Sequence, residues 1–137
     1  MELPADLQPL HRLLIDVGVD VRFASPPQRG AYGLYQPRFR RLWVSPLTKE
    51  LGILRHTFIH EAVHAAQACP SQVLSPLGIS TTLSPVVRQR VRLLLHTHYS
   101  HRHTALEKEA FEIQGRPDAV PLLIKQMQKR CSSVGKR

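Results

Sequence analysis

Four leucines near the start of the chain recur at intervals of three or four residues: Leu7, Leu10, Leu13 and Leu14. This spacing is typical of a helix with one buried face, because an α-helix turns once in about 3.6 residues. We therefore predict a helix over residues 6–17, with Asp6 as its N-cap and Gly18 as its C-cap.

The following segments have the pattern of strands. Apolar and polar residues alternate from Val19 to Phe23, as they do in a half-buried strand. Two further short strands are predicted at residues 31–35 and 41–44, and the turn-prone segment 36–40 between them indicates a β-hairpin. The sequence thus predicts about three short strands.

Helical patterns return in the rest of the chain. Residues 51–69 are mostly apolar and predict a buried helix, with Ser45 or Thr48 available as its cap. Ser84 and Pro85 begin another predicted helix that runs to about Leu95.

Two shorter helices are predicted near the C-terminus. Thr104 and Glu107 have the spacing of a capping box at the start of a helix that ends at Gln114. The last helix begins near Asp118 and has an apolar stripe formed by Val120, Ile124, Met127 and Cys131. Residues 132–137 are predicted to be a frayed tail.

From the length of the chain, we predict that these elements form one domain over residues 1–137. We predict an α+β fold in which a short twisted sheet packs with helices. No apolar run approaches the roughly 20 residues of a membrane span, and the first residues lack the features of a secretory signal. We therefore expect a cytoplasmic protein without a membrane partner.

Only two cysteines are present, Cys69 and Cys131. They could pair, but two cysteines do not make a disulfide scaffold, and we expect reduced, buried thiols. The net charge of +9 raises the question of a nucleic-acid partner. The basic residues are spread along the chain, and we expect no interleaved aromatic side chains that would form a stacking platform, which favours a general basic surface over a nucleic-acid groove.

The most specific chemical signal is His60-Glu61-Ala62-Val63-His64 inside the predicted buried helix. Residues four apart project from the same helix face, so His60 and His64 are placed to bind one Zn²⁺ through their imidazole nitrogens. Glu61 lies about 100° round the helix, beside the metal, where it is placed to act as a general base. Ionisable groups in an apolar helix also need partners, which a metal would supply.

Two histidines do not complete a catalytic zinc site, which usually has three protein ligands. The candidates for the third ligand are three glutamates, Glu107, Glu109 and Glu112, and four histidines, His96, His98, His101 and His103. Glu107 and Glu109 differ by about 200° on a helix and flank its buried stripe almost symmetrically, so periodicity does not choose between them. The small Ala110 beside Glu107 favours Glu107, because it allows a close approach of the two helices.

A helical His-Glu-x-x-His followed by Glu107-Lys108-Glu109-Ala110 resembles the gluzincin metallopeptidases, especially their small single-domain members. The resemblance implies a zincin-like domain that hydrolyses peptide bonds in peptide or protein substrates. It also implies that His60, His64 and Glu107 are the zinc ligands and that Glu61 is the general base. The layout is similar over the middle two-thirds of the chain, but only the two motifs are specific.

The chain departs from the family four residues after the third ligand. Many relatives have Asp or Asn there to hold a motif histidine, whereas this chain has Phe111. A backbone carbonyl or Gln114 would then have to orient the histidine. His56 is expected to be an ordinary histidine, and Tyr99 is a weaker candidate for stabilising an oxyanion.

Two other functions remain open at this point. One is a non-catalytic binding module stabilised by zinc, with a fourth ligand from the histidines between 96 and 103. The other is a basic, nucleic-acid-associated peptidase with a histidine as its third ligand. The sequence makes no prediction of substrate, cleavage preference or oligomeric state.

Overall fold

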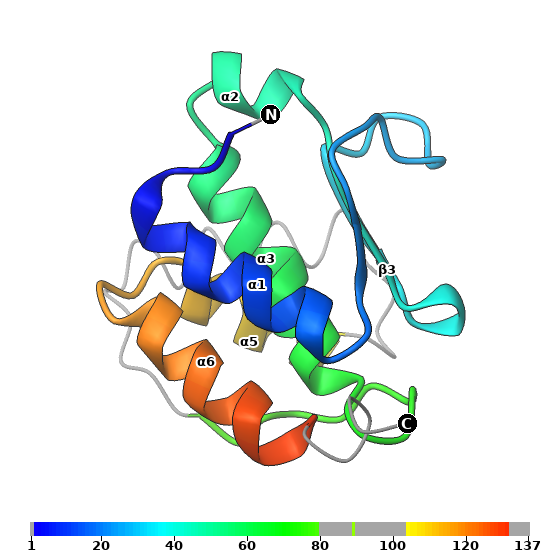
Figure 1. Cartoon of the computed structure of the whole chain (residues 1–137), viewed down its shortest axis with the longest axis vertical. Coiled ribbons are helices and arrows are strands. Elements are labelled where there is room, and N and C mark those ends of the chain that lie inside the picture. Colours follow the sequence, from blue (N-terminus) through cyan, green and yellow to red (C-terminus); the bar gives the residue numbers. More distant parts are fainter. Residues whose placement is uncertain (1, 80–88, 90–103, 132–137) are drawn as a thin grey trace.

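The computed structural model describes residues 2–79, 89 and 104–131 of the chain. Its fold is α+β with one small three-stranded sheet, as predicted (Figure 1). The elements in chain order are η1 (Ala5–Leu7), α1 (Gln8–Asp16), β1 (Asp20–Arg22), β2 (Gly33–Gln36), η2 (Pro37–Phe39), β3 (Arg41–Val44), α2 (Leu47–Glu50), α3 (Leu54–Gln67), α5 (Thr104–Gln114) and α6 (Ala119–Arg130). Apart from residue 89, the predicted helix from Ser84 to Leu95 lies outside the described residues, as do the four clustered histidines, Tyr99 and the predicted tail.

The sheet is mixed and has the strand order β1-β3-β2. Strands β2 and β3 form the predicted antiparallel hairpin, and β1 pairs parallel to β3. Alternation along β3 buries Leu42 and Val44 completely while Arg41 and Trp43 face the other way, as the sequence pattern predicted. The sheet therefore has one apolar face for the helices to cover.

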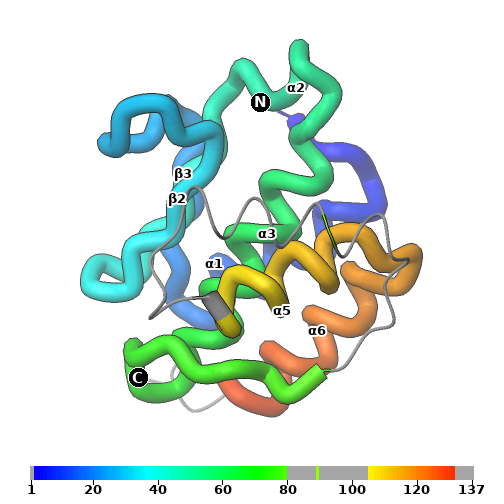
Figure 2. Tube along the Cα trace, turned by 180° about the vertical axis from the view of Figure 1, so that it is seen from behind, coloured from blue at the N-terminus to red at the C-terminus, as the bar shows by residue number. Residues whose placement is uncertain are grey.

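Helix α3 lies between the sheet and the C-terminal helices, with β2 and β3 on one side and α5 and α6 on the other (Figure 2). Every residue from Phe58 to Gln67 is buried. This enclosure explains why most residues from Phe58 to Gln67 are apolar, with His60, Glu61, His64 and Gln67 as the polar exceptions. The side chains of the His-Glu-x-x-His motif therefore lie in the centre of the fold.

The first helix ends as predicted but begins differently. Gly18 has φ +94°, and the backbone bonds Gly18 N–H to Ile15 O and Val19 N–H to Leu14 O form a Schellman motif. Asp6 does not cap α1, because it lies within η1 and forms an ion pair with Arg55. The N-cap prediction for Asp6 was wrong.

The predicted caps of the motif helix were also wrong. Ser45 and Thr48 instead belong to the entry of the short helix α2, where Leu47 N–H donates to Ser45 Oγ at 3.3 Å. The Thr48 hydroxyl donates to the Ser45 carbonyl at 2.7 Å. Helix α3 then begins at Leu54, without a side-chain cap.

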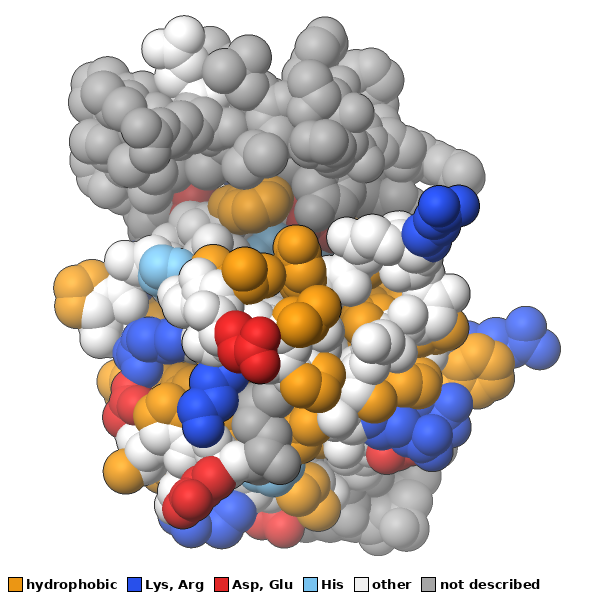
Figure 3. Space-filling model, turned by 90° about the horizontal axis from the view of Figure 1, so that it is seen from above, with side chains coloured by type: hydrophobic (Ala, Val, Ile, Leu, Met, Phe, Trp, Pro, Cys, Tyr) orange, Lys and Arg blue, Asp and Glu red, His pale blue; other side chains and the backbone are white. Residues whose placement is uncertain are grey.

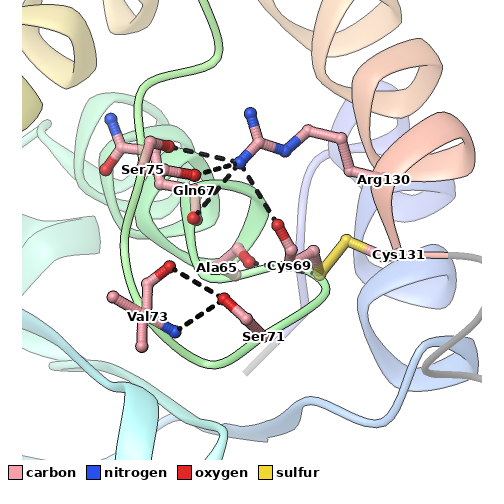
Figure 4. Close-up of a disulfide and its surroundings, with 8 residues drawn as sticks. All are labelled: Ala65, Gln67, Cys69, Ser71, Val73, Ser75, Arg130 and Cys131. Atoms are coloured by element: carbon pink, nitrogen blue, oxygen red, sulfur yellow. Dashed lines mark hydrogen bonds between the residues drawn. A yellow bond between two sulfur atoms is a disulfide. The ribbon is translucent and has the colours of Figure 1, made fainter.

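The two cysteines form a disulfide, so the expectation of reduced thiols was wrong. Cys69 follows α3 and Cys131 follows α6, so the bond between these cysteines, 62 residues apart in sequence, joins the ends of the two helices (Figure 4). The neighbouring Arg130 donates to the carbonyls of Gln67 and Cys69 and to the Ser75 hydroxyl. The disulfide and Arg130 together hold the chain that leaves α3.

Replacing Cys69 or Cys131 by Ser should lower the free energy of unfolding by roughly 2–4 kcal/mol. The reason is the loop that the disulfide closes, which restricts the unfolded chain. Urea unfolding of the Cys69→Ser variant against the oxidised native chain measures this difference. Equal midpoints with equal slopes would contradict the presence of the disulfide in the native protein.

Basic and aromatic side chains lie together on the outer face of the sheet. Arg22 and Arg41 lie over the Trp43 ring at 5.6 and 6.0 Å, and Arg38 and Arg41 each lie 5.5 Å from the Phe39 ring. The prediction that the basic residues lack interleaved aromatics was therefore wrong for this segment. Figure 3 shows Lys and Arg side chains beside hydrophobic ones on the end of the molecule that it views.

Among the described residues, no helix has the length and apolar character that a membrane span requires.

Candidate metal centre

Helices α3 and α5 bring His60, His64 and Glu107 together. His60 Nε2 lies 3.0 Å from one Glu107 carboxylate oxygen, and His64 Nε2 lies 2.9 Å from the other. The ligand atoms of the three residues all lie within 4.8 Å of one another. Both histidines are buried and Glu107 is half-buried, so the cluster is largely shielded from solvent.

The other glutamate of the pair, Glu109, faces away from the histidines and has a structural role. Its side chain is 7% exposed and accepts hydrogen bonds from the backbone N–H groups of Leu77 and Gly78 at 2.7 and 3.0 Å. It also accepts a hydrogen bond from Gln67 Nε2 at 2.9 Å. The two glutamates thus have different roles. Glu107 contacts the two histidines, and Glu109 binds the backbone of the segment that follows α3.

Two glutamines contact the outer nitrogens of the histidines. Gln114 Oε1 lies 2.7 Å from His60 Nδ1, so the residue named from the sequence as a partner for a histidine is at that place. Gln67 Oε1 lies 2.7 Å from His64 Nδ1, a contact that the sequence analysis missed. Its signal was present, because Gln67 is three residues after His64 and such residues share a helix face.

The hydrogen bonds of Gln67 fix the proton on His64. Gln67 Nε2 donates to Glu109 and to the Leu106 carbonyl, so its Oε1 is the acceptor that faces His64. His64 Nδ1 must then carry a hydrogen, and Nε2 is the nitrogen that points toward Glu107. Such a contact on the outer nitrogen orients a metal-binding histidine and selects its tautomer.

The cluster fits a divalent cation. His64 Nε2 is buried and has no hydrogen-bond partner in the described part of the chain, although the Glu107 carboxylate is close to it. Two imidazole nitrogens and a carboxylate oxygen converge, which is a donor set that zinc accepts. His60 and His64 together with Glu107 could therefore hold Zn²⁺.

The close charges shift the pKa of two groups strongly. Burial opposes the charge of His64, but contacts with Glu107 and Glu61 outweigh it and raise the pKa of His64 to about 9. Burial also opposes the charge of Glu107, but the two histidines outweigh it and lower the pKa of that carboxyl to about 2. At neutral pH a proton on His64 therefore balances the Glu107 carboxylate when no cation is bound.

Zinc affinity should consequently rise with pH. The pKa of His64 is raised, so its proton stays on the ring until the pH approaches about 9, and zinc must displace it at any lower pH. We expect the apparent association constant to rise by about one log unit per pH unit between about pH 6 and 8. Competition with a chelator measures this slope, and the His56→Ala variant, altered outside the cluster, should show the same slope. A flat profile would contradict the assignment of His64 as a ligand.

Glu61 lies outside the three-residue cluster, on the side of α3 that faces β2. Burial raises the pKa of its carboxyl, while the nearby histidines and a hydrogen bond from the Tyr35 backbone N–H lower it. Gly33 permits this approach: a Cβ there would lie 2.7 Å from Thr57 Cγ2 and 3.0 Å from Glu61 Cγ. Strand β2 can therefore pack directly against the Glu61 side chain, because residue 33 has no side chain.

Gly33→Ala should therefore displace Glu61 or the strand. We expect a loss of roughly 1–3 kcal/mol in the free energy of unfolding from overpacking. A shift of Glu61 by about 1 Å would lower any reaction that depends on it roughly a hundredfold. Gly115→Ala is the matched control, since a Cβ at residue 115 has no neighbour within 4 Å. Equal behaviour of the two variants would contradict a tight fit at Gly33.

A cleft of about 580 Å³ opens onto this site. Strand β2 and the preceding loop form one wall, and α3 and α5 form the other. His56 lies in the cleft lining, exposed and outside the metal cluster. Phe111, at the position where the gluzincin pattern has a polar residue, lies against His60 with the ring centroids 4.6 Å apart.

Comparisons with protein-family models, with curated proteins and with solved structures find no match to this chain.

Proposed function

We propose that the protein is a zinc-dependent peptidase with a zincin-like domain. One observation carries the proposal: His60 and Glu107 of the His60, His64 and Glu107 cluster line a cleft, and the buried carboxyl of Glu61 lies beside them in the same lining. This arrangement joins a metal-binding set to a separate proton acceptor. The gluzincin resemblance of the two motifs supports the same reaction.

His60, His64 and Glu107 would hold the metal, and Gln114 and Gln67 would keep the two imidazoles in place. Bound zinc would polarise the scissile carbonyl and acidify the attacking water. A group of three protein ligands would leave a position open for these reactants, as catalytic zinc sites do.

Glu61 would act as the general base and then as the general acid. Its buried carboxyl has a raised pKa, which suits a group that must both take up and release a proton near neutral pH. It would accept a proton from the attacking water at a carboxylate oxygen and deliver that proton to the leaving amine. The Tyr35 N–H would hold the carboxylate in place through both steps.

Strand β2 supports a peptide as the substrate. It pairs with β3 along one edge, and no other described strand pairs with its second edge. The register with β3, together with the bond from Ser45 N–H to Tyr32 O, directs the backbone groups of Gly33 and Tyr35 toward that free edge. The Tyr35 N–H bonds to Glu61, which leaves the Gly33 N–H and the carbonyls of Gly33 and Tyr35 for a ligand. An extended peptide in the cleft could add to this edge through main-chain hydrogen bonds.

The test begins with the purified protein and its metal content. We expect one equivalent of zinc, cleavage of an unstructured protein such as casein, and loss of cleavage on chelation with recovery on adding zinc back. The His64→Ala variant should lose both zinc and cleavage. Zinc with four protein ligands and no cleavage would favour the zinc-stabilised binding module instead.

A further inference from the structure

A second groove continues the cleft along β2. Its volume is about 450 Å³, and it is lined by β2 and by η2 as far as Arg38 and Phe39. Gln28 and Leu34 line both spaces, so the two grooves meet at that point. Together the two grooves run along β2, with Glu61 of α3 in the lining at one end and Phe39 of η2 at the other.

Outside the site itself, the charges along this path are positive. Apart from Glu61 and Glu107 in the site itself, the charged side chains that line the two grooves are Arg29 and Arg38. No other described carboxylate lines either groove. The net charge of +9 adds to the positive potential of this face, so the path favours a negatively charged ligand.

Unlike Arg22 and Arg41, Arg38 has no acidic partner among the described residues. Arg22 and Arg41 each form an ion pair with Asp20, at 3.1 and 3.0 Å. The Arg38 guanidinium is exposed and lies 5.5 Å from the Phe39 ring, at the far end of the path. Its donors are therefore available to a carboxylate of a ligand.

We propose that the joined groove selects acidic peptides, with Arg38 binding an Asp or Glu side chain of the substrate. This inference rests on the proposed peptidase function. Strands rise about 3.3 Å per residue, and Arg38 lies beyond the end of β2 while Gly33 lies beside Glu61, so the acidic side chain would be roughly three to five residues from the cleaved bond.

Binding can be measured without turnover by using the Glu61→Gln variant loaded with zinc. The probes are short fluorescent peptides that carry Glu, Gln or Lys at each position within five residues of a central bond. We expect the Glu peptides to bind about two- to fivefold more tightly than the Gln peptides, since an exposed ion pair contributes modestly. Adding Arg38→Glu should remove this preference and favour the Lys peptides. Arg12→Glu, which changes the charge equally outside the grooves, should retain the preference for Glu.

Two results would overturn the proposal. One is equal binding of the Glu and Gln peptides to the native groove. The other is an equal effect of Arg38→Glu and Arg12→Glu on the preference. If a single-stranded oligonucleotide binds in an Arg38-dependent way and acidic peptides do not, the groove serves nucleic acid and the peptide assignment is wrong.

The same measurements separate this inference from the proposed function. Binding of acidic peptides that depends on Arg38, with no cleavage by the zinc-loaded native chain, would support the groove and contradict the peptidase. Cleavage that is indifferent to substrate charge would support the peptidase and contradict the groove.

Discussion

Glu61→Gln is expected to bind zinc as the native chain does and to hydrolyse peptides at least about a hundredfold more slowly. General acid–base catalysis typically contributes about 10²- to 10⁴-fold, and an amide cannot accept the proton of the attacking water at neutral pH. The amide preserves the shape of the side chain in its tight place beside Gly33. A loss of activity would therefore reflect the missing base rather than a rearranged site.

Zinc stoichiometry, unfolding midpoint and cleavage rate should be measured together on this variant. Glu112→Gln is the matched control, because it makes the same change on α5 outside the cluster and the cleft. A native cleavage rate in Glu61→Gln with zinc bound would contradict the catalytic assignment. A loss of zinc in the same variant would show that Glu61 holds the metal site together rather than acting as a base.

The sequence predicted the local features of this site because they depend on helix and strand periods. Four-residue spacing places His60 and His64 on one face, and the alternation in residues 41–44 buries Leu42 and Val44. The three-stranded α+β fold follows from the same patterns. Whether residues 1–137 form one domain stays a prediction, as does the cytoplasmic location.

Two of the errors concern contacts between segments that are distant in sequence. Cys69 and Cys131 come together only because α3 and α6 end side by side, which no local pattern indicates. The disulfide bears on the expected cytoplasmic location, since reducing compartments keep most thiols free. Asp6 likewise forms an ion pair with Arg55, 49 residues away, instead of capping its own helix.

The choice between Glu107 and Glu109 also depends on a contact with a segment that is distant in sequence. Helix periodicity placed them almost symmetrically about the buried stripe and could not decide. The structure separates them through a third segment: the backbone N–H groups of Leu77, Gly78 and Ile79 need an acceptor, and Glu109 supplies it. No local pattern in the sequence indicates that this segment passes α5.

Glu107→Gln and Glu109→Gln should consequently rank in opposite order in two measurements, zinc affinity and stability without metal. A zinc site with a binding free energy of about 10–16 kcal/mol shared by three or four ligands would lose roughly several hundredfold in affinity without Glu107. Glu109→Gln acts only through Gln67 on His64, so we expect a smaller loss of about tenfold to a hundredfold.

Stability without metal should show the reverse order. Glu109 is buried and accepts bonds from Gln67 and from the Leu77 and Gly78 N–H groups, so weakening these charge-assisted bonds should cost about 1–3 kcal/mol in the free energy of unfolding. Chelator competition and urea unfolding in the presence of excess chelator measure the two quantities. A large zinc loss for Glu109→Gln with nearly native affinity for Glu107→Gln would overturn the ligand assignment, because Glu107 then contributes only to the packing of α5 against α3.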